Sequence, residues 1–350
     1  MKKYYTRACN FYYGKDSKKL VKQKKTLPLK GNSEISFDKI EILTRKSSKK
    51  IHIKKIKNLS KNLKKKITSD LKLIIKKNKN FSNFYFGNSP NIMGILNITP
   101  DSFSDGGKFY KKNLANKQLI NLINSGPSII DVGGESTRPG SKEISQKLEW
   151  KRIEPLLKKF GKRFPLSLDT RKSEIMEKGI RIGVKLINDI SGLKYDKKSI
   201  SVLKKYKTPF IIHHIQGTPD TMQVNPKYKN VLFDIYDFFE ERIKYARNNG
   251  IKHNNIIVDP GIGFGKNLKH NMKLISNISI FHSLGFPILL GISRKRFIKD
   301  VSGKNDSKQR SGGTIATSLF SMMQGVQILR VHDVNDIIQG IKVFKKLIKS

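Results

Sequence analysis

Arg330 and His332 are the side chains of this chain most clearly suited to bind an anion. They lie two residues apart at the end of the apolar run QILRV (327–331), so both side chains point to the same side of a strand. The guanidinium group of an arginine presents a planar fork of donors that matches the oxygens of a phosphate. This strand end is therefore a candidate anion site.

Polar side chains also end the other short apolar runs of the chain. A polar or charged group is costly to bury without a partner, so these residues predict contacts with one another or with a ligand. The residues are, in chain order, Asn97, Asp131, Asp169, Asn188 with Asp189, His213 with His214, Asp259, and Ser293 with Lys295.

The apolar runs themselves alternate with amphipathic stretches of helix length. The runs span 92–97, 128–132, 165–169, 184–190, 209–214, 255–259, 287–293 and 327–331, and helices are predicted at 113–125, 146–160, 228–249, 267–284, 311–325 and 334–348. Eight strand-then-helix units over ~260 residues fit a (β/α)₈ TIM barrel, in which the carboxyl ends of all strands meet at one rim. The alternative, a doubly wound open sheet, would spread the polar residues along an edge.

Four segments between these runs are rich in glycine and polar residues, which is typical of loops that clamp a substrate. They are 97–110, 131–141, 258–266 and 291–298. Pro260 and Asn267 break the pattern of a nucleotide-binding P-loop, and Lys266 breaks the spacing of a Rossmann motif. Adjacent histidines face opposite sides of a strand, which argues against a metal site at 213–214.

The order of these loops resembles one enzyme family, the dihydropteroate synthases. The resemblance covers about residues 91–350 and lies in NITPDSFSDGG, IDVGGESTRPGS, LDTRK, INDISG, HHIQGTPDTMQ, VDPGIGFGK, GISRKRF and RVHDV. The segments YYTRACNFYYG and TLPLKG are weakly similar to a leader found on some alphaproteobacterial members. The resemblance implies a transferase on a (β/α)₈ barrel. It would condense (7,8-dihydropterin-6-yl)methyl diphosphate with 4-aminobenzoate by an SN1-like route and release diphosphate.

The resemblance also implies roles for individual residues at the strand ends. Catalytic roles fall on Asp101, Asp169, Lys295 and Arg330. Residues that bind the pterin diphosphate are Thr137, Asp169, Asn188, Asp259, Lys295, Arg330 and His332. Residues that bind 4-aminobenzoate are Phe103, Thr137, Arg138, Pro139 and Arg296. Asn97 is the implied contact of a Mg²⁺ ion, a metal that prefers oxygen ligands.

Two positions depart from the family pattern. Arg296 stands where many members have a serine that touches the aminobenzoate carboxylate, and His213 stands where a methionine that packs on the pterin is common. A structural alternative also exists for Asp259, because Asp-Pro-Gly suits a turn before a helix and the carboxylate would then cap that helix. Of the neighbours Asn188 and Asp189 only one can face the barrel interior, and the resemblance selects Asn188.

The composition of the 350-residue chain is strongly basic, with 71 Lys and Arg against 27 Asp and Glu and a net charge of +44. The excess is densest in residues 1–85, which we expect to form a small α+β extension with strands at 34–43 and 50–56 and a helix near 59–77. Residues 88–350 would form the barrel. No apolar run approaches the ~18 to 20 residues of a membrane helix. No signal peptide is recognised, and the one cysteine, Cys9, suits a reducing cytoplasm.

The expected partners are the two small-molecule substrates and a second copy of the chain, since members of the family are usually dimers. We expect neither a membrane nor a nucleic-acid partner, because the lysines are scattered and no nucleic-acid motif accompanies them. Two other functions remain open at this point. One is a pterin-binding methyltransferase module, and the other is a basic nucleic-acid-binding protein whose extension is the working part.

Overall fold

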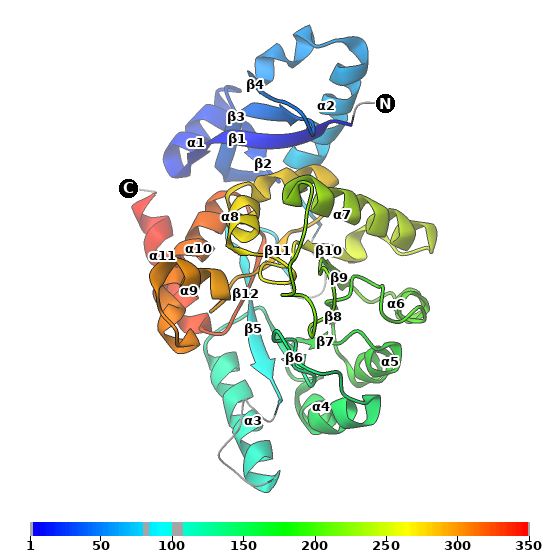
Figure 1. Ribbon diagram of the computed structural model, residues 1–350. Helices are drawn as coiled ribbons and strands as arrows, with labels where there is room; N and C mark the ends of the chain where they lie inside the picture. Colours follow the sequence, from blue (N-terminus) through cyan, green and yellow to red (C-terminus); the bar gives the residue numbers. More distant parts are fainter. Residues whose placement is uncertain (1–2, 80–83, 100–107, 349–350) are drawn as a thin grey trace.

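The computed structural model describes residues 3–79, 84–99 and 108–348, with side chains omitted for 108–112. Within these ranges the chain forms a barrel that begins at residue 91 and a smaller N-terminal sheet (Figure 1). No helix among the described residues is both long and apolar enough to cross a membrane.

Eight parallel strands form the wall of the barrel. They are β5 (Asn91–Asn97), β6 (Ile129–Gly133), β7 (Leu166–Asp169), β8 (Leu186–Asp189), β9 (Phe210–His213), β10 (Ile256–Asp259), β11 (Leu289–Gly291) and β12 (Ile328–Val331). Their order is β10-β9-β8-β7-β6-β5-β12-β11, and a parallel bridge between Val258 and Ile288 joins the two ends of this order. The predicted (β/α)₈ barrel is confirmed, and the open sheet is excluded because the sheet closes.

Helices connect the strands on the outside of the barrel. They are α3 (Lys108–Asn124), α4 (Gln146–Phe160), α5 (Ser173–Ile182), α6 (Ser199–Tyr206), α7 (Val231–Asn248), α8 (Leu268–Ser276), α9 (Arg296–Ser302), α10 (Ser311–Met323) and α11 (Val334–Leu347). Among the described residues, the 3₁₀ turns η3 (His253–Asn255), η4 (Ile278–Leu284) and η5 (Ser307–Arg310) accompany them. The single helix predicted at 267–284 is wrong, because α8 ends at Ser276 and η4 follows.

The inward-facing side chains of the strands form two layers inside the barrel, an apolar lower layer and a polar layer at the mouth. Ile129 and Ile328 belong to a buried cluster that includes one residue from most strands, and Phe84 and Phe86 join this cluster from the segment before β5. Side chains two residues apart in a strand share a face. Asp131 and Arg330 therefore lie above Ile129 and Ile328 inside the same barrel, one step closer to its mouth.

The N-terminal extension is a four-stranded antiparallel sheet with helices. Its elements are β1 (Tyr5–Tyr13), α1 (Gly14–Lys22), β2 (Leu27–Leu29), β3 (Asn32–Leu43), β4 (Ser48–His52), η1 (Ile53–Asn58) and α2 (Lys61–Ile75). The long strand β3 pairs with β1 on one side and with β2 and β4 on the other. The strand predicted at 50–56 ends earlier, at His52, and β1, α1 and β2 were not predicted.

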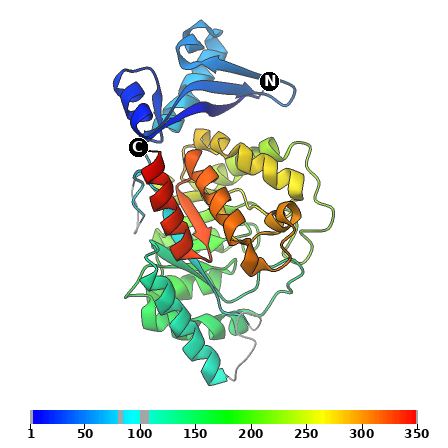
Figure 2. The same cartoon turned by 90° about the vertical axis from the view of Figure 1, so that its left-hand side faces the viewer.

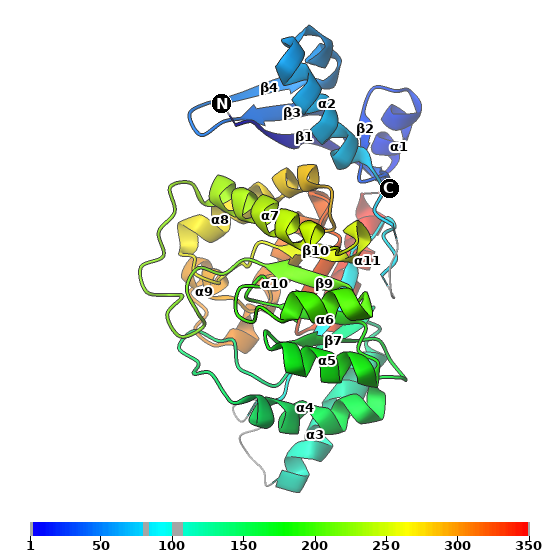
Figure 3. The ribbon, with the colours of Figure 1, turned by 90° about the vertical axis from the view of Figure 1, so that its right-hand side faces the viewer.

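The extension packs against the outside of the barrel, on α7 and η4 (Figures 2 and 3). The Tyr5 ring of β1 stacks on Phe233 with 4.4 Å between ring centroids, and the Tyr5 hydroxyl donates to Asp237 at 2.9 Å. Arg45 adds ion pairs of 2.7 Å to Asp234 and to Asp237. These contacts attach the basic extension to the outer side of the barrel. They do not involve the side chains that point into the barrel.

Candidate functional site

Arg330 links three strands at the centre of the barrel mouth. Its Nε atom donates to Oδ2 of Asp131 at 2.7 Å, and its Nη2 atom donates to Oδ2 of Asp169 at 2.8 Å. Asn188 adds a fourth strand, because its Nδ2 atom donates to the same Oδ2 of Asp131 at 2.9 Å. Side chains from β12, β6, β7 and β8 thus meet in one hydrogen-bonded cluster.

The charges of this cluster stabilise one another against burial. Burial raises the pKa of Asp169, and the Arg330 guanidinium opposes that rise. For Arg330, burial acts to lower the pKa, but the carboxylates of Asp131 and Asp169 overcome this and raise it. Arg330 therefore remains a cation between two acids, which is the form that can also attract an anionic ligand.

Two acceptor atoms of the cluster are left for a ligand. Oδ1 of Asp131 and Oδ1 of Asn188 are buried and have no hydrogen-bond partner among the residues that the structure describes. A buried acceptor without a donor is costly, so such atoms point to a ligand that supplies the donors. A flat molecule with N–H groups along its edge would satisfy them.

Asp259 lies at the end of β10 on another side of the same mouth. Its Oδ1 atom accepts from the backbone N–H of Gly261 at 2.7 Å, and its Oδ2 atom lies 3.9 Å from Nε2 of His213. Burial raises the pKa of Asp259 to about 6, although nearby Lys295 and Arg330 oppose the rise. The structural alternative for Asp259 is wrong, because the next helix, α8, begins at Leu268 with Asn267 as its N-cap.

The turn after Asp259 can only be built with glycine at its second position. Gly261 has φ +66°, and a Cβ atom placed there would lie 1.9 Å from the carbonyl oxygen of His214. A side chain at this position would therefore clash with backbone. The glycine lets its own N–H reach the Asp259 carboxylate, so it helps to fix the orientation of that acid.

Lys295 places a cation beside Asp259 and Arg330. Its Nζ atom lies 4.1 Å from the centroid of the Phe264 ring, a cation–π distance. Burial, assisted by the charge of Arg330, lowers the pKa of Lys295 to about 8, while Asp259 and Asp169 act to raise it. A Cβ atom placed on Gly291 would lie 3.9 Å from Oδ2 of Asp259 and 4.0 Å from Cδ of Arg330, so the acid of β10 and the cation of β12 lie close together at the mouth.

His332 and Ser293 extend the site toward the anion side. The hydroxyl of Ser293 accepts from the backbone N–H of His332 at 3.2 Å and lies 3.0 Å from Nδ1 of the same histidine. Burial and the neighbouring cations, Arg294 first among them, lower the pKa of His332 to about 3. The imidazole is therefore neutral. We assign the Ser293 hydroxyl as the donor to Nδ1, and in this tautomer Nε2 carries the N–H that can donate to a ligand.

The remaining residues predicted for the site lie on the surrounding loops. Thr137 and Asn97 are half-buried, and Arg138 and Pro139 are exposed on the loop after β6. Arg296 is the first residue of α9, and its largely exposed side chain lies 3.6 Å from Asp300. Asp101 and Phe103 lie outside the described residues.

The neighbours Asn188 and Asp189 divide their roles as the alternation of a strand requires. Asn188 faces the interior and contacts Asp131, whereas Asp189 faces away and accepts from the backbone of Ser191 at 2.8 Å and of Leu193 at 3.0 Å. Asp189 is thus a structural acceptor for the loop that follows β8.

Asp131 and Ser293 are two members of the site that our sequence analysis listed among the polar residues at strand ends without giving either of them an individual role. Asp131 lies in the middle of β6 and not at its end, with Gly133 two residues later on the same face. The signal that would have assigned Asp131 to the interior is its spacing from Gly133. Residues two apart in a strand point to the same face, so an acid two residues before an inward-facing glycine also faces the interior. No comparable signal marks Ser293.

Comparison with known proteins finds one family over the barrel. A family model described as "Pterin binding enzyme" matches residues 93–332. The dihydropteroate synthase of Escherichia coli K12 is 39% identical over 263 residues, which are 75% of this chain and 93% of that protein. That of Clostridium beijerinckii is 43% identical over 254 residues, covering 72% and 91%.

Solved structures show the same likeness. A Yersinia pestis dihydropteroate synthase in a sulfonamide drug complex has 37% identity and a TM-score of 0.70, over 75% of this chain and 95% of that one. A Xanthomonas albilineans enzyme in complex with 7,8-dihydropteroate has 31% identity and a TM-score of 0.67, over 74% and 94%.

Proposed function

The chain belongs to the dihydropteroate synthase family of pterin-binding enzymes, and from this premise we propose how the residues of its barrel mouth act. The reaction condenses (7,8-dihydropterin-6-yl)methyl diphosphate with 4-aminobenzoate and gives 7,8-dihydropteroate and diphosphate, a step of folate biosynthesis. The single observation that carries the assignment of roles is the buried cluster of Arg330, Asp131, Asp169 and Asn188.

The pterin ring binds, in this proposal, to acids and amides inside the mouth. A pterin carries N–H donors along one edge, and Oδ1 of Asp131 and Oδ1 of Asn188 are buried acceptors without a partner among the described residues. Asp169 and Asp259 supply further carboxylates. Lys295 donates to the carbonyl and nitrogen side of the ring, where a cation suits an acceptor.

The diphosphate binds to the cationic side of the mouth. Arg330 supplies a charged fork, and the neutral imidazole of His332 donates from Nε2 because Ser293 occupies Nδ1. Thr137, on the loop after β6, supplies a hydroxyl for the same group. These donors stabilise the negative charge that grows on the diphosphate as it leaves.

A magnesium ion fits this arrangement through one protein ligand, Asn97. The amide oxygen of Asn97 lies at the end of β5, 3.5 Å from the position that a Cβ of Gly133 would occupy. The described residues hold no group of three or more His, Cys, Asp or Glu that would form a closed metal cage. When bound, the ion would neutralise charge on the diphosphate and keep most of its waters.

The reaction proceeds by loss of diphosphate ahead of attack. The dihydropterin ring delocalises the positive charge of the departing methylene group, and Asp169 and Asp101 stabilise that charge. The aromatic amine then attacks the methylene carbon and forms the C–N bond. The resulting ammonium group is strongly acidic and gives its surplus proton to the released diphosphate or to water, so no strong general base is required.

4-Aminobenzoate occupies a slot beside the loop that carries Thr137, Arg138 and Pro139, with its carboxylate near Arg296. Phe103, which lies outside the described residues, keeps the aminobenzoate contact that the resemblance implies. The long, exposed side chain of Arg296 would give up its 3.6 Å contact with Asp300 for this purpose. A relative was solved in complex with a sulfonamide drug. We place sulfonamides in the same slot here, as mimics of 4-aminobenzoate.

Exposed apolar side chains support a dimer of the chain, and its cysteine content supports a cytoplasmic location. Phe320 on α10 is 47% exposed and Val343 on α11 is 57% exposed, so these helices offer an apolar face to a second copy of the chain. Light scattering of the purified chain should give a dimer. We place the enzyme in the cytoplasm, where a lone cysteine stays reduced.

The test of the function is a direct assay of the full chain. Purified protein with both substrates and Mg²⁺ should release diphosphate and form dihydropteroate, and a heat-inactivated sample is the control. No product above that control would refute the synthase activity. Binding of methyltetrahydrofolate without diphosphate release would favour a pterin-binding methyltransferase instead.

A further inference from the structure

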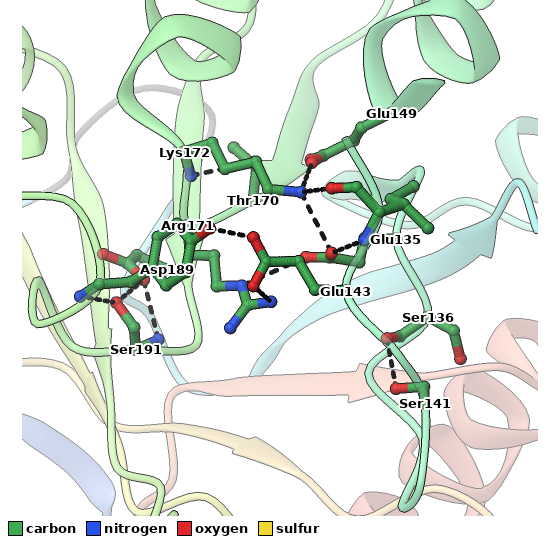
Figure 4. Close-up of polar contacts among 12 residues, drawn as sticks. Glu135, Ser136, Ser141, Glu143, Glu149, Thr170, Arg171, Lys172, Asp189 and Ser191 are labelled. Carbon is green, nitrogen blue, oxygen red and sulfur yellow. Dashed lines mark hydrogen bonds and ion pairs between the residues drawn. The ribbon is translucent and has the colours of Figure 1, made fainter. Parts of the chain in front are cut away.

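Lys172 is a buried lysine that touches none of the proposed substrate positions. It precedes α5, and its side chain is 2% exposed. Its Nζ atom donates to Oε1 of Glu135 at 3.1 Å, to Oε2 of Glu149 at 2.8 Å and to the backbone carbonyl of Ile144 at 2.7 Å. Figure 4 shows the amine between the two carboxylates, so it joins the start of α5 to the loop between β6 and α4.

Glu135 holds both ends of that loop with one carboxylate. Its Oε1 atom accepts from the backbone N–H of Ile144 at 2.9 Å as well as from Lys172. Its Oε2 atom accepts from Nε of Arg171 at 3.2 Å, and Nη2 of Arg171 lies 3.3 Å from Glu143 (Figure 4). Residues 135 and 144 are therefore fixed to each other and to the segment after β7.

The loop between these ends is a preformed turn. The hydroxyl of Ser141 donates to the carbonyl of Ser136 at 2.7 Å, and the N–H of Gly140 donates to the carbonyl of Pro219 at 3.0 Å. Thr137, Arg138 and Pro139 lie within this turn. Their positions therefore depend on the buried charges at its base.

The segment on the other side of these charges carries Asp169. Asp169 is three residues before Lys172, and it is held inside the mouth by Arg330 at 2.8 Å. Taking charges out of water is costly, and replacing a buried ion pair by apolar residues often stabilises a protein. Stability alone is thus a poor reason for Glu135, Glu149 and Lys172, and a fixed geometry between two parts of a site is a better one.

We propose that Glu135 and Lys172 are positioning residues that set the 4-aminobenzoate loop, residues 136–143, at the distance from Asp169 that the second substrate requires. This inference rests on the proposed function of the barrel mouth. It adds a role for two residues that touch neither substrate. A shift of about 1 Å in such a loop can cost about 10²-fold in rate, because the attacking amine must lie at the correct distance and angle from the pterin methylene.

The test compares the two substrates in full-length variants. Glu135→Gln keeps the shape of the side chain but turns one acceptor into a donor that faces Arg171, and Lys172→Met removes the amine. We expect the KM for 4-aminobenzoate to rise at least ~10-fold in both. The affinity for the pterin diphosphate, measured by calorimetry without 4-aminobenzoate, should fall clearly less than the KM for 4-aminobenzoate rises, since only the Thr137 hydroxyl is displaced with the loop and no bond to Arg330 is lost.

Lys205→Met is the matched control. Lys205 forms a 3.0 Å ion pair with Glu177 on the surface, so the same substitution there should change neither constant. Circular dichroism establishes which variants fold. If Lys172→Met does not fold, the kinetics of Glu135→Gln alone test the positioning role.

The outcomes separate this inference from the proposed function. Wild-type chain that turns over, together with a folded Glu135→Gln variant whose KM for 4-aminobenzoate is unchanged, overturns the positioning role alone. An equal loss of affinity for both substrates also overturns it, because a general loosening of the fold would then explain the result. Wild-type chain without turnover overturns both.

Discussion

The Nε atom of Arg330 on β12 lies 2.7 Å from Oδ2 of Asp131 on β6. The strand between them is β5, so this ion pair spans the inside of the barrel and not two paired strands. Asp131 is wholly buried, and it orients the guanidinium so that the Nη2 atom reaches Asp169. The acid in the middle of β6 thus sets the direction of the cation that we assign to the diphosphate.

Asp131→Asn should impair catalysis strongly while leaving a folded chain. The amide keeps one acceptor oxygen, but it removes the negative charge that holds Arg330 and it places a donor near the ligand. We expect kcat/KM for the pterin diphosphate to fall by about 10- to 100-fold. Steady-state kinetics measures this, with Asp237→Asn as the control, because that acid pairs with Arg45 outside the barrel. Equal rates in Asp131→Asn and wild type would remove Asp131 from the site.

Alanine at Asp169, Lys295 or Arg330 should each lower turnover by about 10²-fold or more, because each change deletes a charged hydrogen bond inside a water-poor pocket. Arg330→Ala also leaves Asp131 and Asp169 as unpaired buried acids. Thermal unfolding should therefore show a larger loss of stability for Arg330→Ala than for Lys295→Ala. Three variants with near-normal rates would mean that the site lies elsewhere.

The pH dependence of kcat/KM should be bell-shaped. Burial raises the pKa of Asp259 to about 6, and the ionised acid is the form that accepts from pterin N–H groups, so activity falls as the pH drops through that value. Burial lowers the pKa of Lys295 to about 8, so the cation and the activity are lost as the pH rises through it.

Two substitutions identify which group controls each side of the pH profile of kcat/KM. Asp259→Asn should abolish the acid limb, and Lys295→Arg should move the alkaline limb upward because an arginine stays protonated. A profile of Asp259→Asn that retains the wild-type acid limb would show that another group controls it.

The barrel and most of its mouth could be predicted from the sequence because local signals were strong there. Each buried strand is a short, mainly apolar run. Asp169, Asn188 and Asp259 stand at strand ends, and the convergence of these ends at one rim of a barrel accounts for the polar residues there. Asp131 was listed among the polar residues at strand ends but given no individual role, because its run, SIIDV, looks like an ordinary strand with an acid near the end. Only the closed sheet shows that Asp131 and Arg330 meet.

Strand β1 of the extension was missed for a different physical reason. Tyr5 and Thr6 are both buried although they point to opposite faces of the strand. Tyr5 packs on α7 of the barrel, and the hydroxyl of Thr6 donates to Asp70 on α2. The start of β1 is thus covered on both faces, so the sequence there shows no alternation of apolar and polar residues that would predict a strand.

Tyr5 offers the sharpest test of how the extension is attached. Its ring is fully buried, stacked on Phe233 at 4.4 Å and edge-on to Tyr236 at 5.2 Å. Truncation of a buried aromatic side chain costs about 3–5 kcal/mol, so Tyr5→Ala should lower the thermal midpoint clearly. Tyr5→Phe, which loses only the hydroxyl that donates to Asp237, should cost about 1 kcal/mol.

The catalytic constants of the folded Tyr5→Ala chain should equal those of wild type, because Tyr5 contacts the outer face of α7 and none of the inward-facing residues. Hydrogen exchange should speed up in β1 and in the first turns of α7 and stay unchanged in β6, β7 and β12. Faster exchange in those barrel strands, or a changed KM for either substrate, would show that the extension supports the mouth of the barrel and is not merely docked beside it.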